Sequence, residues 1–170
     1  ASQDGPATAD AITRLSQLAA ATEMAGPGIT VTLDDAPNAE EGSLNRVLDR
    51  DLQDIVNQLW RAGATGVAIN EQRLTATSAI RAAGEAILVN YQPISRPYRV
   101  VAVGAVDEAQ ERSGLQALLA QLTDDYGLVT DARGGDVALP AGEVRAPRFA
   151  STTTTAEPDS TATIEPGGTP

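Results

Sequence analysis

The segment Asp51–Arg81, DLQDIVNQLWRAGATGVAINEQRLTATSAIR, carries the most informative pattern of apolar residues and glycines in the chain. Its first part, with the residues just before it, predicts an amphipathic helix, because apolar side chains recur at the spacing of one helix face: Leu48, Leu52, Ile55, Val56 and Leu59. Gly63 suits the end of that helix, and residues 66–70, GVAIN, are typical of a short buried strand. The stretch therefore predicts a helix that leads directly into a strand of the core.

The residues before this stretch predict another strand and another helix. Residues 29–33, ITVTL, alternate apolar and polar side chains, which predicts a strand with one buried face. Strand, helix and strand in this order predict a right-handed crossover and a parallel pair. Further upstream, residues 10–25 carry apolar side chains at helical spacing, and Asp10 is a candidate N-cap.

The residues after the stretch predict mainly strands. They are expected at three closely spaced places: residues 73–77, 86–89 and 98–103. A helix over residues 107–123 follows, and two short strands are expected at 128–131 and 137–139. We therefore predict an α+β fold, a two-layer sandwich with a mixed sheet of about five to seven short strands, two main helices on one face, and an N-terminal helix.

Three segments are expected along the chain. Residues 1–25 form the N-terminal helix, residues 26–148 a globular α+β domain, and residues 149–170 a disordered tail rich in Thr and Pro. An isolated helix of about 15 residues is marginal in water, so the first helix needs a partner surface. That surface is either another chain, with this helix as the end of a coiled coil, or the chain's own domain.

The composition excludes several kinds of chemistry. The chain has 12 basic residues, all arginine, against 23 acidic ones, and it has no Lys, His or Cys. Triads with histidine, lysine Schiff bases and zinc, haem or iron–sulfur sites built on Cys or His are therefore excluded. The net charge of −11 argues against nucleic acid as a partner, because neutralising phosphates needs a basic face.

Carboxylates remain as candidates for catalysis or metal binding, but their pattern supports neither role. The acidic residues between Asp34 and Asp54 lack the order of a calcium-binding loop. Paired carboxylates hydrolyse glycosides in other proteins, yet only 3% of this chain is aromatic, and sugar sites usually use aromatic platforms. We therefore expect no metal, no cofactor and no enzymatic activity.

Charge is distributed unevenly along the chain. Residues 34–54 contain seven acidic residues against two arginines, whereas residues 72–99 contain four arginines against Glu85 alone. Two interpretations stay open: the arginines form an anion-binding face, or they pair with the neighbouring acidic segment. The candidate binding residues are the four arginines with two polar neighbours: Arg73, Arg81, Arg96, Arg99, Asn70 and Gln72.

Several short signatures occur in order between residues 26 and 144. They are Ala62-Gly63-Ala64, Ile69-Asn70, Gln72-Arg73, Thr75-Ala76-Thr77-Ser78 with Arg81, and Val89-Asn90. This pattern resembles the YlxW-like proteins of Gram-positive bacteria, a family known as domain of unknown function 881, and the lysine-free composition resembles an actinobacterial source. The family often has glycine after both asparagines, where Glu71 and Tyr91 stand here, so either the turns differ or these residues accept strain.

The resemblance implies a location more than a chemistry. Family members are typically single-pass membrane proteins with an extracytoplasmic coiled coil and this domain, often encoded beside cell-division genes. The chain begins with Ala1, so we expect a membrane anchor upstream of it. The expected function is a non-catalytic interaction scaffold on the extracytoplasmic side of the cell membrane, linked to the envelope or to division. The alternative is a small-anion-sensing module that uses the Arg-rich face.

The resemblance also implies which partners to expect. They are membrane proteins of the envelope or of division, and a second copy of the chain bound through the N-terminal helix.

Overall fold

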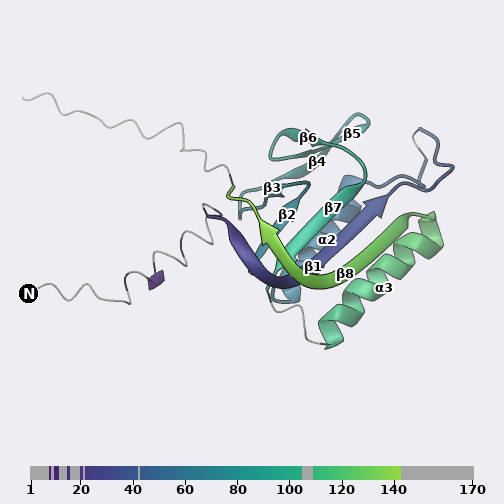
Figure 1. Cartoon of the computed structure of the whole chain (residues 1–170). Helices are drawn as coiled ribbons and strands as arrows, with labels where there is room; N and C mark the ends of the chain where they lie inside the picture. Colours follow the sequence, from purple (N-terminus) through teal and green to yellow (C-terminus); the bar gives the residue numbers. More distant parts are fainter. Residues whose placement is uncertain are drawn as a thin grey trace, which may run out of the picture.

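The computed structural model of the chain describes residues 22–41, 43–104 and 109–142, with residues 8, 10, 11, 15 and 20 before them. Two sheets and two helices form the domain (Figure 1). In chain order the elements are β1 (Met24–Asp34), α2 (Asp49–Arg61), β2 (Gly66–Ile69), β3 (Gln72–Arg73), β4 (Ile80–Ala83), β5 (Ala86–Val89), β6 (Gln92–Ile94), β7 (Tyr98–Val103), α3 (Ala109–Tyr126) and β8 (Val129–Leu139). The α+β class and the two main helices are thus confirmed.

The larger sheet has five strands in the order β3-β2-β7-β1-β8, and every pairing in it is antiparallel. β1 and β2 do run in the same direction, but β7 lies between them and pairs with both, through Ala102 opposite Ile29 and Val67. The predicted parallel pair and the mixed sheet are therefore wrong. The crossover is a split β-α-β unit, in which a later strand enters the space between its two strands.

Helix α2 forms for the reasons that its sequence predicts. Leu48 is the N-cap residue, and its backbone N–H donates to Asp51 Oδ2 at 2.8 Å, which satisfies one donor at the helix start. After Ala62, Gly63 takes a φ of 87°, a conformation that glycine adopts without strain. The helix buries its apolar stripe: Leu52, Ile55, Val56 and Leu59.

Both helices contribute to one core on the same face of the five-stranded sheet. Leu115, Leu119 and Leu122 of α3 pack with the apolar stripe of α2 in a single buried cluster. Every second residue of the central strands, such as Ile29, Val31 and Leu33 of β1, belongs to the same cluster. In Figure 1, α2 lies behind the sheet and α3 runs beside β8. The opposite face of the sheet carries no helix, so the described residues leave it open.

A second, three-stranded sheet of order β4-β5-β6 packs against α2. The helix side chains bind the outer edge of β4: Gln53 Nε2 donates to Ile80 O at 2.9 Å, and Ala82 N donates to Asp49 Oδ2 at 3.1 Å. An ion pair between Arg46 and Glu85 adds a second link to this sheet. One sheet of five to seven strands is therefore replaced by two antiparallel sheets.

The strands β4 and β6 were not predicted, and the bounds of other strands differ from the predicted ones. β1 begins at Met24, so the predicted helix does not extend to Ala25; residues 10, 11 and 15 are helical, but most of residues 1–21 and the tail 149–170 lie outside the described residues. β8 is one strand of 11 residues instead of two, because Gly134-Gly135 bends the chain without breaking its pairing with β1. Of the predicted strand 73–77 only Arg73 lies in a strand, β3, since Thr75 N donates to Ser78 Oγ in a turn.

Candidate functional site

The open face of the five-stranded sheet presents two rows of side chains, because residues directly opposite each other in antiparallel strands share a face. In one row Thr32 of β1 lies between Arg99 of β7 and Asp131 of β8. In the next row Thr30 lies between Val101 and Arg133. This face thus combines hydroxyl, guanidinium and carboxylate groups above an apolar strip.

The paired strands β1 and β8 bend together over one side of this face (Figure 1). Gly28 makes the bend possible, because a Cβ there would collide with the carbonyl oxygen of Ala102. The bend brings Met24 and Leu139 over Gly66 of β2, where they form a second, small apolar cluster. The open face is therefore concave rather than flat.

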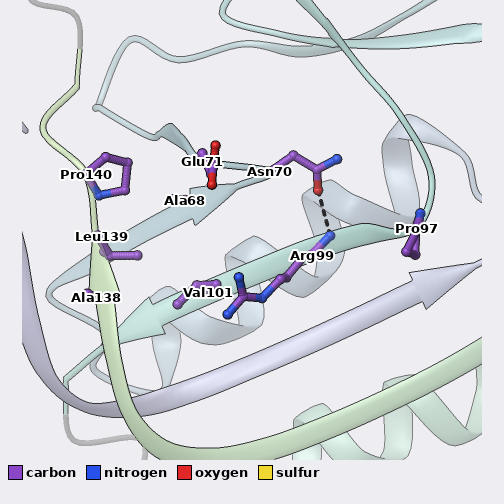
Figure 2. A pocket seen from close by; sticks show the side chains of 9 residues that line it. All are labelled: Ala68, Asn70, Glu71, Pro97, Arg99, Val101, Ala138, Leu139 and Pro140. Atoms are coloured by element: carbon purple, nitrogen blue, oxygen red, sulfur yellow. Dashed lines mark hydrogen bonds between the residues drawn. The ribbon is translucent and has the colours of Figure 1, made fainter.

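Two hollows lie side by side on this concave face and share Arg99. The first has a volume of about 620 Å³ and runs from the turn after β2 to the end of β8 (Figure 2), with Ala68, Val101 and Leu139 as its apolar part. The second has a volume of about 650 Å³ and is polar; its lining includes Thr30, Thr32, Asp131, Arg133 and Asp136. Figure 2 shows the Arg99 side chain lying along β7 toward Val101.

Arg99 has a fixed backbone and an unpaired charge. Its N–H donates to Asn70 Oδ1 at 2.7 Å, and its carbonyl accepts from Asn70 N at 2.9 Å. Its side chain is exposed, and no ion pair joins it to an acidic side chain within the described residues. By contrast, Arg133 on the same face pairs with Asp131 at 2.8 Å. Arg99 is therefore the free cation of this surface among the described residues.

The turn beside the first hollow is a hairpin turn without glycine. Asn70 and Glu71 have φ values of 44° and 69°, as the central residues of a type I′ turn require. Asn90 and Tyr91 repeat this geometry between β5 and β6, with φ values of 52° and 66°. Both turns therefore have the backbone conformation that glycine favours, and Glu71 and Tyr91 adopt it at a cost in conformational energy.

Arg73, a predicted binding residue, is buried and serves as a structural clamp. It is 3% exposed, and its Nη1 donates to the carbonyl oxygens of Thr22 and Pro140 at 3.1 and 3.2 Å. It thereby ties the beginning of β1 to the end of β8. Its Nε has no partner among the described residues, and burial lowers the pKa of its guanidinium. Arg73 is not available to a ligand on the open face.

The remaining candidates do not form one site. Arg96 donates to the buried carboxylate of Asp35 at 2.6 Å, which supports the ion-pair interpretation for this residue. Arg81 is exposed in β4, in the second sheet, and Gln72 lies opposite Ile69, on the face turned toward the helices. Asn70 is engaged with Arg99 and with Ser95 O, at 2.6 Å. Of the six candidates, Arg73 lies on the same face of the sheet but is covered, and only Asn70 and Arg99 line the hollows.

The sequence analysis missed most residues of the open face. Thr30 and Thr32 were predictable, because they are the polar positions of the alternating run 29–33. Asp131 and Arg133 were not, because the two short strands predicted near them gave no register with β1. The open face combines strands that are distant in the sequence, so a charge count along the chain does not find it.

The described residues do not form a metal-binding cluster. Within residues 22–41, 43–104 and 109–142, no three Asp or Glu side chains lie close enough together to hold a metal ion. Neither described helix is long and apolar enough to cross a membrane. The open face offers a guanidinium, hydroxyl groups and an apolar strip, a set that suits binding of a carboxylate next to an apolar group.

The chain belongs to a family of bacterial proteins of unknown function, DUF881, whose model matches residues 11–151. It is 41% identical over 150 residues to the UPF0749 protein Rv1823 of Mycobacterium tuberculosis, which covers 80% of this chain and 49% of the relative. It is 36% identical over 118 residues to the UPF0749 protein YlxW of Bacillus subtilis, which covers 67% of this chain and 51% of that protein. The chain therefore spans about half the length of these relatives, and the resemblance to YlxW-like proteins is confirmed.

A solved structure supports the fold. The crystal structure of an uncharacterized conserved protein from Mycobacterium tuberculosis superposes with a TM-score of 0.65, over 83% of this chain and 98% of the other. The two sequences are 21% identical, so the likeness concerns the fold alone.

Proposed function

We propose that this chain is a non-catalytic binding domain that recognises an extended, acid-bearing segment of a partner protein on the open face of its larger sheet. The observation that carries the proposal is Arg99, an exposed cation with no described acidic partner, placed where two hollows meet. An arginine in this position binds a carboxylate through its planar donor fork.

The first hollow supports a protein segment as the occupant. Its accessible apolar lining is Pro97, Ala138 and Pro140, which line the same hollow as Arg99, so it accepts an apolar side chain next to the carboxylate. A segment with alternating acidic and apolar residues meets both needs when it lies along the concave face. Glu71, Asp131 and Asp136 also line the two hollows, so the choice of an acidic ligand depends on Arg99 and not on the charge of the whole face.

The proposal includes a place for the domain in the cell. We place it on the extracytoplasmic side of a single-pass membrane protein, where it serves as a scaffold for the envelope or for cell division. The chain belongs to the DUF881 family and spans about half the length of its relatives. Both findings are compatible with a longer protein that carries a membrane anchor. A cysteine introduced at exposed Arg81, in a cysteine-free full-length protein, should react with a membrane-impermeant maleimide in intact cells; reaction only after lysis contradicts this placement.

A small-anion sensor is the second candidate, and the same arginine favours it. The two candidates differ in what the first hollow contributes. We would titrate ¹⁵N-labelled chain with a short valine–glutamate peptide and, separately, with acetate. Binding of the peptide alone, with amide shifts on β1, β7 and β8, supports the proposed function. Equal affinity for acetate supports the sensor instead, and no shift with either probe refutes both.

A further inference from the structure

Most sheet edges in this domain are protected against pairing with another strand. β3 has only two residues, and β6 has three and contains Pro93, which cannot donate a backbone hydrogen bond. The edge of β4 is bound by Gln53 and Asp49 of α2. Within the described residues these three edges offer little to an incoming strand.

The fourth edge, β8, is different. It is 11 residues long, its register with β1 is continuous, and it contains neither proline nor lysine. Its residues are largely exposed, including Val129, which is 51% exposed. No described backbone group bonds to its outer side. β8 is therefore a long edge strand with free donors and acceptors, the feature that strand addition uses.

The charges on β8 are self-complementary. Asp131 and Arg133 lie two positions apart on the open face, at 2.8 Å from each other, with Ala132 between them. When two copies of β8 pair in antiparallel fashion about a two-fold axis at Ala132, Asp131 of each copy lies directly opposite Arg133 of the other. Opposite charges in directly opposite positions stabilise strand pairing. Because the two-fold axis relates the two copies, both contribute the same strand, and the assembly stops at a dimer.

From this edge and its charge pattern, we infer that the protein forms a homodimer through antiparallel pairing of β8 with β8 of a second copy, with the two-fold axis at Ala132. The paired segment is residues 129–135. Val129 then faces Gly135 of the second copy, where the Cβ position is open, and Thr130 faces Gly134, where the flexible end of Arg112 lies 3.3 Å from the Cβ position and has to move aside. The two five-stranded sheets become one continuous sheet.

The pairing has a consequence for the proposed binding face, although it does not depend on that proposal. Asp131 and Arg133 line the second hollow. A second copy at β8 therefore places two such hollows side by side across the two-fold axis. A dimeric ligand, or a long one, would then meet both copies at once.

Sedimentation velocity of the full chain over a micromolar-to-millimolar series tests the inference. The wild-type protein should show a reversible monomer–dimer equilibrium. Asp131→Arg and Arg133→Asp each place like charges opposite one another, so each should weaken dimerisation about tenfold or more. The double variant D131R/R133D restores the alternation and should restore the dimer. Asp136→Arg makes the same charge change outside the paired segment and should leave the dimer unchanged.

Cross-linking tests the register. The chain has no cysteine, so Ala132→Cys introduces a single thiol. In the inferred register this thiol lies opposite the same thiol of the second copy at the two-fold axis, so mild oxidation should give a disulfide-linked dimer. Arg133→Cys is the control, because its two Cα atoms would lie roughly 8 Å apart, beyond disulfide reach. A wild-type monomer throughout, or a dimer that both single charge variants leave intact, overturns the inference; the latter assigns dimerisation to another surface, such as the N-terminal segment.

Discussion

Asn70 holds the backbone of Arg99 at both ends, through its side-chain oxygen at 2.7 Å and its own N–H at 2.9 Å. Its Nδ2 also donates to Ser95 O at 2.6 Å. A turn residue thereby fixes the start of β7, the strand that presents Arg99 to both hollows. Asn70 therefore positions the binding surface, but its side chain already makes hydrogen bonds within the domain and has little hydrogen-bonding capacity left for a ligand.

Asn70→Ala should therefore destabilise the protein by about 2–3 kcal/mol, because it removes both side-chain hydrogen bonds and leaves a β-carbon at positive φ. Asn70→Gly removes the same hydrogen bonds but suits the backbone, so its cost should be about 1 kcal/mol smaller. Urea unfolding of the two variants measures both values. A cost below about 0.5 kcal/mol for Asn70→Ala would show that the turn does not depend on this side chain.

The strained turn positions give the opposite prediction. Glu71→Gly and Tyr91→Gly should each stabilise the fold by about 0.5–1 kcal/mol, since both residues have φ near 65–70° and Tyr91 is 66% exposed. Gly84→Ala is the matched control, because Gly84 has a φ of 62° and no atom lies within 4 Å of the position that a Cβ would take, and this change should destabilise. Thermal unfolding compares the three; stabilisation by Gly84→Ala would refute the strain assignment.

These turns also show what the sequence could establish. The family signatures located both asparagines, and the apolar periodicities located α2, α3, β5 and β7, because each of these signals is local. The insertion of β7 between β1 and β2 was not predictable, since Ala102 contacts partners that are 35 and 73 residues away in the chain. The open face depends on that insertion, so Arg99 could be selected as a candidate but not separated from Arg73, Arg81 and Arg96.

Arg73 provides a test of the clamp between the two ends of the curved strand pair. Arg73→Ala should cost about 2–4 kcal/mol, because it removes buried packing and the donors to Thr22 and Pro140. Arg73→Met keeps the packing and removes a buried charge for which the described residues hold no carboxylate, so it should cost half as much or less. Equal losses in urea unfolding would show that the charge, not the stem, holds the clamp.

Asp51 gives a prediction about pH. Burial raises the pKa of its carboxyl above the ordinary 3.8, although the bond from Leu48 N opposes this shift. A raised pKa means that the folded state favours the protonated form, so this group's stabilising contribution is complete at low pH and is lost as the pH rises through the folded-state pKa. Asp51→Asn keeps an acceptor for Leu48 without the buried charge.

The wild-type protein should therefore gain stability relative to Asp51→Asn as the pH falls from neutral toward 3.8. Paired urea titrations at several pH values follow the difference in unfolding free energy. Asp124→Asn, at an exposed position on α3 that does not act on the pKa of Asp51, is the control. A difference that moves the other way would mean that the hydrogen bond outweighs burial.

Binding by the open face through Arg99 can be measured as the affinity of a labelled valine–glutamate peptide for two matched variants. Arg99→Ala and Arg81→Ala remove the same charge from exposed positions, one on the open face and one on the second sheet. In fluorescence anisotropy, Arg99→Ala should weaken binding about tenfold or more, and Arg81→Ala should leave it unchanged. Equal losses in both variants, or no loss in Arg99→Ala, would contradict the proposed site.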